Sequence, residues 1–107
     1  MVDDEDHVLR PFDRAEAVTV ASAAKKAGVS ERTVQNWCVA HRIGRRIAGG
    51  PWRVSSPALL MLLDGDERAL RAYRQGDRVS ERVLHYFRIA GLKKPQNPQE
   101  PQGQYGE

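Results

Sequence analysis

The stretch TVASAAKKAGVSERTVQNWCVAHR, residues 19–42, contains two short helical patterns joined by Gly-Val-Ser. In the first pattern, apolar residues from Val20 to Ala27 recur at the i, i+3, i+4 and i+7 spacing of one helix face. Thr19 suits the N-cap of this helix, and Gly28 suits its C-terminal stop. The pattern therefore predicts a short helix that ends in a tight turn.

Ser30 is the expected N-cap of the second helix, which we predict from Glu31 to His41 or Arg42. At about 100° per residue, the face opposite its apolar side carries one arginine, two amides and one small apolar residue. These side-chain types read base edges in duplex DNA. Two short helices around so tight a turn predict a helix-turn-helix, whose second helix presents Arg32, Gln35, Asn36 and Val39.

A β-hairpin is predicted directly after this helix. Extended residues at Ile47 and Trp52 to Val54 flank a turn at residues 48–51, which contains Gly-Gly. A hairpin in this position is a wing, which contacts backbone phosphates or the minor groove. Trp52 either packs the hairpin against the helices, the interpretation we favour, or inserts between bases. The arms of the hairpin carry Arg45, Arg46 and Arg53.

Three more helices are predicted beyond the wing. The first begins with Ser56 as its cap and Pro57 at its first position, and it is rich in leucine. The others cover about residues 67–75 and 80–90. They have three interpretations: additional core, a second DNA-reading unit in which Arg82 faces the duplex, or a dimer surface. That surface would consist of Tyr73, Tyr86, Phe87 and Ile89.

Charge is distributed unevenly over the 107 residues. Residues 17–63 carry seven Lys or Arg against Glu31 alone, and such a basic block favours a polyanionic partner. We therefore divide the chain into an acidic flexible lead-in, a DNA-binding module, a two-helix extension and a disordered Pro/Gln-rich tail. The predicted boundaries are 1–16, 17–63, 64–94 and 95–107.

The sequence contains no pattern typical of catalysis. Cys38 and the three histidines are scattered without metal-ligand spacing. We find no Gly-rich phosphate loop with a Lys-Ser/Thr partner and no nucleophile motif. The longest strongly apolar run is too short to span a membrane. We therefore expect no catalytic residues, no metal, no cofactor and no membrane association, and a cytoplasmic location.

Residues 17–63 resemble the winged helix-turn-helix modules of phage excisionases and MerR-like regulators. The shared pattern is an apolar-Thr-apolar opening, an Ala pair, Gly-Val-Ser, Thr-Val followed by Trp, a Gly-rich wing, Trp-Arg-apolar and a Leu-rich helix. In this chain those elements are Val18-Thr19-Val20, Ala23-Ala24, Gly28-Val29-Ser30, Thr33-Val34, Trp37, Gly49-Gly50, Trp52-Arg53-Val54 and Leu59 to Leu63.

The resemblance implies a mainly α fold: two helix-turn-helix helices, a small hairpin wing and a third helix, here with two additional C-terminal helices. It implies that Arg32, Gln35 and Asn36 face the major groove, and that Ser30 and Thr33 contact the backbone. It also implies phosphate or minor-groove contacts for the arginines at and before the wing, namely Arg42, Arg45, Arg46 and Arg53.

The function implied is sequence-specific binding of double-stranded DNA. The protein would act either as an excisionase-type recombination directionality factor or as a small phage- or plasmid-type transcriptional regulator. A homo-oligomer or cooperative array on DNA is the expected assembly. The alternative is a protein adaptor, in which residues 67–90 recruit a recombinase, packaging enzyme or polymerase.

Overall fold

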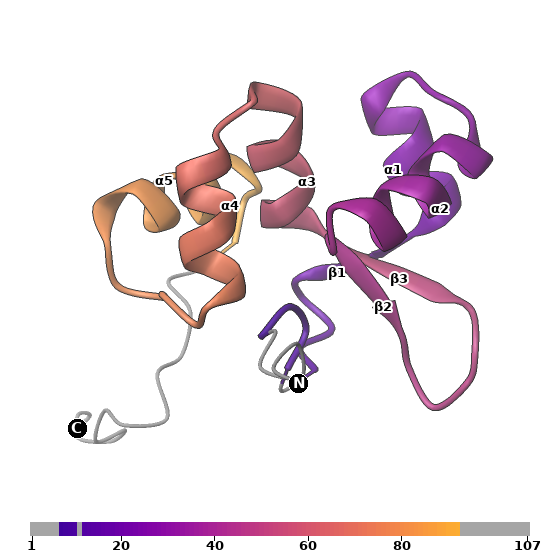
Figure 1. Ribbon diagram of the computed structural model, residues 1–107, viewed down its shortest axis with the longest axis horizontal. Helices are drawn as coiled ribbons and strands as arrows, with labels where there is room; N and C mark the ends of the chain where they lie inside the picture. The colour runs from indigo at the N-terminus through magenta and orange to yellow at the C-terminus, as the bar shows by residue number, and fades with distance from the viewer. Residues whose placement is uncertain (1–6, 11, 93–107) are drawn as a thin grey trace.

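A computed structural model describes residues 7–10 and 12–92. These residues form five helices and a three-stranded antiparallel sheet (Figure 1). The mainly α winged helix-turn-helix with two additional helices is thereby confirmed. The predicted tail, residues 95–107, lies outside the described residues. The elements are β1 (Ala17–Thr19), α1 (Val20–Ala27), α2 (Glu31–Ala40), β2 (Gly44–Arg46), β3 (Trp52–Ser55), α3 (Ser56–Asp64), α4 (Glu67–Arg74) and α5 (Glu81–Ile89).

The helix-turn-helix forms at the residues that its caps predict. Thr19 Oγ1 accepts a hydrogen bond from the Ser22 N–H at 3.0 Å, and Ser30 Oγ accepts one from the Thr33 N–H at 3.1 Å. Gly28 ends α1 in the left-handed conformation, with φ of 74°. The two helices bury their apolar faces against each other and the rest of the core, through Val20, Ala23, Ala24, Val34 and Cys38.

The sheet differs from the hairpin expected from sequence. Its order is β1-β3-β2, because β1 pairs with the second edge of β3 and places Val18 opposite Val54. The wing strand β2 begins at Gly44 and ends before Ile47, which lies in the turn. Only glycine fits this start, since a Cβ at residue 44 would lie 2.3 Å from the carbonyl oxygen of Arg53.

The cap of α3 is Ser55 rather than the predicted Ser56. Ser55 Oγ accepts a hydrogen bond from the Ala58 N–H at 3.2 Å, while Ser56 is already the first helical residue. Extended pairing of β3 with β1 continues to Ser55, so strand and helix adjoin without a loop. The side chain that caps the helix therefore also ends the strand.

The N-terminal segment is packed rather than flexible where the structure describes it. Val8 and Leu9 are fully buried, and the His7 N–H donates a hydrogen bond of 2.8 Å to the carbonyl oxygen of Arg74. Glu16, also in the predicted lead-in, is only 9% exposed. The prediction of flexibility is wrong for these residues. Val8 and Leu9 are two apolar residues among charged ones and show no periodicity in the sequence, yet they pack onto the core.

The extension, α4 and α5, packs against α3 and joins one continuous core with the helix-turn-helix (Figure 1). Tyr73 and Phe87 meet edge to face, with ring centroids 6.0 Å apart. They are buried, as is Tyr86, so of the four residues considered for a dimer surface only Ile89 is exposed. Of the three interpretations, additional core fits this packing. Within the described ranges, no helix is long and apolar enough to cross a membrane.

Candidate nucleic-acid interface

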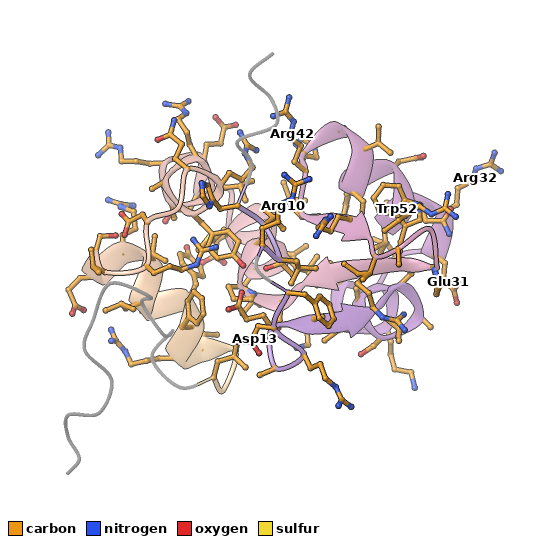
Figure 2. The ribbon with its side chains drawn as sticks, turned by 90° about the horizontal axis from the view of Figure 1, so that it is seen from below. Arg10, Asp13, Glu31, Arg32, Arg42 and Trp52 are labelled. Carbon is orange, nitrogen blue, oxygen red and sulfur yellow. The ribbon has the colours of Figure 1, made fainter. Side chains whose placement is uncertain are left out.

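The outward face of α2 carries the predicted base-reading residues. Arg32, Gln35 and Asn36 are exposed, and Val39 beside them is 69% exposed. Among the described residues, none of the three polar side chains has a hydrogen-bond or ion-pair partner. Figure 2 shows Arg32 projecting away from the body of the protein at the outer end of α2. The structure thus presents an arginine and two amides together, and their donors and acceptors face solvent.

The N-terminal turn of α2 brings together the two predicted backbone-contacting hydroxyls. Ser30 Oγ donates 3.0 Å to Thr33 Oγ1, so the Thr33 hydroxyl hydrogen is left to point elsewhere. The helix N-terminus adds partial positive charge, which favours an anion such as phosphate. Glu31, exposed in the same turn, opposes this effect and limits how closely a phosphate approaches.

The arginines of the wing divide over the two faces of the sheet. Arg45 and Arg53 are directly opposite each other on β2 and β3, so their side chains share one face. Arg46 lies on the other face, opposite Trp52. Its guanidinium donates to the carbonyl oxygens of Gly50 at 2.8 Å and Gly49 at 2.9 Å. Arg46 therefore holds the wing tip closed, which the sequence did not indicate.

The Arg45 and Arg53 pair has an unusual charge environment. Like charges directly opposite each other weaken a strand pair, and no carboxylate among the described residues pairs with either side chain. Arg45 Nη1 donates only a long 3.3 Å hydrogen bond, to the carbonyl oxygen of Leu9. A surface that concentrates positive charge in this way is suited to a polyanion.

Trp52 is half-buried and packs against the core, and Figure 2 shows it beside α2. This position matches the packing role that we favoured over insertion between bases. Cys38 is on the buried side of the same helix, and burial raises the pKa of its thiol to about 11. The thiol is therefore protonated at neutral pH and serves as a packing group.

Arg42 occupies a strained position between α2 and the wing. It is exposed and adopts a left-handed backbone with φ of 57°, which a non-glycine residue rarely adopts. It lines a small open hollow of about 100 Å³, together with Val8, Arg10, Gly44 and Arg45. Figure 2 shows Arg10 and Arg42 on the same side of the molecule. Three arginines from three separate segments thus surround one hollow beside the end of α2.

Sequence reasoning missed two groups of basic residues near this interface. Arg10 belongs to the lead-in for which the sequence predicts flexibility, and only the burial of its neighbours Val8 and Leu9 brings it to the hollow. The arginines of α4 lie in the extension, for which the sequence predicts no single role. Their three-residue spacing, at positions 68, 71 and 74, was the available signal.

The part of the chain that contains the helix-turn-helix and the wing is similar to a known protein family. A family model described as a helix-turn-helix domain matches residues 17–65, which covers β1 to the end of α3. No curated protein and no solved structure matches the chain. Domains of this type are typically non-enzymatic. Residues 17–65 therefore form a helix-turn-helix domain, which supports a helix-turn-helix DNA-binding family for this part of the chain and DNA as its partner.

Proposed function

We propose that the protein binds double-stranded DNA in a sequence-specific manner, with α2 in the major groove. The observation that carries this proposal is the exposed α2 face, on which Arg32, Gln35 and Asn36 stand together without partners in the described part of the chain. Arginine pairs with guanine in two hydrogen bonds, and asparagine or glutamine pairs with adenine in the same way. Val39, beside them, suits a thymine methyl group.

The remaining predicted site residues act on the backbone in this proposal. Ser30 and Thr33 contact a phosphate at the start of α2. Arg45 and Arg53 contact phosphate or the minor groove from the face of the wing that they share. Arg42 binds a phosphate over the hollow that it shares with Arg10 and Arg45. Arg46 acts indirectly, because it holds the tip of the wing.

We further propose an architectural or regulatory role, as an excisionase-type directionality factor or a small phage- or plasmid-type regulator acting on DNA in a prokaryotic cytoplasm. Bending a short site costs on the order of 1–6 kcal/mol. Several protomers bound side by side would share that cost, which favours a cooperative array for the excisionase role. A two-fold dimer on an inverted repeat is the arrangement expected of a regulator.

Selection of binding sites from a random duplex pool, followed by footprinting, tests the proposal. Enrichment of one motif is the expected result. Head-to-tail copies would support the excisionase role, and an inverted repeat would support the regulator. Weak binding that enriches no motif and disappears by 200 mM salt would refute sequence-specific recognition and direct attention to the adaptor alternative.

Substitution of Arg32 locates the recognition face. Arg32→Ala should weaken binding to the enriched site by about 1–3 kcal/mol and relax the preference at one base pair. Arg88→Ala is the matched control, because it removes an exposed helical arginine that is paired with Glu81 on α5. Equal loss on every sequence would show that Arg32 contacts only phosphate.

A further inference from the structure

One side of α4 carries a row of three arginines, of which Arg68 and Arg71 are exposed and Arg74 is half-buried. Arg68, Arg71 and Arg74 follow at intervals of three residues, which places them along one side of the helix. The opposite side is buried through Ala69, Leu70 and Tyr73. The row is therefore a stripe along one side of the helix, and the core does not require its two exposed members, Arg68 and Arg71.

Three carboxylates of the extension, those of Asp66, Asp77 and Glu81, are engaged elsewhere. Asp66 caps α4 and pairs with Arg82 at 3.1 Å. Asp77 accepts hydrogen bonds from the backbone of Val79 and Ser80, and Glu81 pairs with Arg88 at 3.2 Å. Among the described residues, the Arg68 and Arg71 side chains have no hydrogen-bond or ion-pair partner, and Glu67 forms no ion pair with either. Like charges three residues apart destabilise a helix, so this stripe lacks a structural reason within α4.

The stripe continues into the candidate interface at the end of α2. Arg74 Nη1 donates 3.0 Å to the carbonyl oxygen of His41, the C-cap residue of α2. Arg42, the next residue, lines the hollow with Arg45 of the wing. Figure 2 shows α4 end-on, on the same side of the molecule as α2 and Arg42. The basic residues of α4, the α2 terminus and the wing thus lie along one side of the protein.

We propose that Arg68, Arg71 and Arg74 form a second contact site for the sugar–phosphate backbone of the duplex that α2 and the wing engage. This inference rests on the proposed DNA binding. At about 1.5 Å per residue the row is about 9 Å long, which spans two or three phosphates of one strand at their rise of about 3.4 Å each along the duplex axis. The planar guanidinium groups suit forked contacts to phosphate oxygens. The extension lengthens the footprint of the helix-turn-helix on its α2 C-terminal side.

The test uses the full chain and the DNA site enriched by selection. Arg68→Gln/Arg71→Gln removes two charges but keeps good helix formers on an exposed face. Because each phosphate contact contributes about 0.9 to the salt slope, the double variant should lose about 1.8 from it. The ratio of parent to variant affinity should then shrink about 12-fold between 50 and 200 mM salt. Base preference should be unchanged, and hydroxyl-radical protection should be lost at one edge of the footprint only.

Arg88→Gln/Lys26→Gln is the control for net charge, because it also removes two exposed cations, from α5 and α1. It should leave the footprint edge protected. A double α4 variant with the parent's salt slope and footprint would overturn the inference while leaving the proposed function intact. Absence of any DNA binding by the parent protein would overturn both. The α4 variant should unfold at the parent's temperature or slightly above it, because the substitutions remove repulsion between like charges. A lower unfolding temperature together with an unchanged footprint would instead assign the arginine row a structural role.

Discussion

The hydroxyl of Tyr73 connects the C-terminal helices to the helix-turn-helix, and we predict that its removal weakens the fold in a pH-dependent way. Tyr73 Oη donates a hydrogen bond of 2.8 Å to Glu16 Oε1, and it lies 2.8 Å from Ser55 Oγ. Because the tyrosine has a single hydroxyl hydrogen, Ser55 must be the donor in the second bond. Ser55 Oγ also accepts from the Ala58 N–H. A buried chain of hydrogen bonds therefore runs from the α3 cap through α4 to Glu16.

Tyr73→Phe removes the middle link of this chain. Among the described residues, the Glu16 carboxylate then has no donor and the Ser55 hydroxyl has no acceptor, and both residues are buried. A buried polar group without a partner costs about 1–3 kcal/mol, and a charged one costs more. We expect the variant to lose about 3 kcal/mol of unfolding free energy at pH 7.

The loss should shrink at low pH. Burial raises the pKa of Glu16, with the Tyr73 hydrogen bond and the charge of Arg78 acting in the opposite direction. Because the pKa of Glu16 is higher in the folded protein than in the unfolded chain, ionisation of this carboxyl lowers the free energy of unfolding. This loss of stability is complete above the folded pKa and disappears as the pH falls below 4.5, the usual pKa of glutamate. Loss of the Tyr73 bond raises the pKa further. Each unit of that rise makes the variant's deficit about 1.4 kcal/mol smaller at pH 4 than at pH 7.

Urea unfolding followed by far-ultraviolet circular dichroism, at pH 7 and pH 4, measures both quantities. Tyr86→Phe is the matched control, because the single hydrogen of the Tyr86 hydroxyl is shared between Asp64 Oδ2 at 2.9 Å and Asp66 Oδ2 at 3.1 Å, and Asp64 is exposed to water. The control should lose about 1 kcal/mol. A loss of stability in Tyr73→Phe that is no greater than that of the control at pH 7, or that is the same at both pH values, would refute the role of Tyr73 in this buried chain.

Three further predictions concern the wing and the N-terminal segment. Gly44→Ala should destabilise the protein by about 1–3 kcal/mol in urea unfolding, because the new Cβ would lie 2.3 Å from the Arg53 carbonyl oxygen and 2.9 Å from Cys38 Sγ. Gly50→Ala, whose Cβ meets only the Ile47 carbonyl oxygen at 3.2 Å, should cost less, and equal costs would contradict the close approach. Arg53→Ala should weaken binding to all duplexes alike and reduce the salt slope by about 0.9, whereas an unchanged slope would remove the wing from the DNA. Deletion of residues 1–6, four of which are acidic, should raise affinity for unrelated duplex DNA at 50 mM salt, and an unchanged affinity would show that these acidic residues do not shield the basic residues. Deletion of residues 1–10 should instead unfold the protein, because it also removes the buried Val8 and Leu9.

The helix-turn-helix was predictable because its determinants are local. The Thr19 and Ser30 caps each act on an N–H three residues away, and Gly28 acts through its own backbone. The exposed set on α2 follows from helical periodicity alone. The positions of Arg32, Gln35 and Asn36 therefore needed no tertiary information.

The missed features depend on contacts distant in sequence. Pairing of Val18 with Val54 forms β1, yet three residues carry too short an alternation to predict a strand. Val8 and Leu9 are buried by elements far along the chain. The side-chain bonds of Arg45 to Leu9 and of Arg82 to Asp66 likewise depend on tertiary placement. Sequence showed which residues are basic, but not which of them are occupied within the fold.

The contacts of the basic residues determine how the fold withstands repulsion between their positive charges. Arg78 lies 3.9 Å above the Tyr73 ring and donates to the carbonyl oxygens of Tyr73 and His7, so it ties the extension and the N-terminal segment together. With the Glu16–Tyr73–Ser55 chain, this fixes α4 against the helix-turn-helix. Repulsion among the arginines of α4, Arg42 and the wing is then opposed by a well-packed core and, within the described part of the chain, not by ion pairs with carboxylates. Self-repulsion that a fold sustains without internal counterions is expected where a polyanion supplies them, and binding of such a partner should stabilise the protein most at low salt.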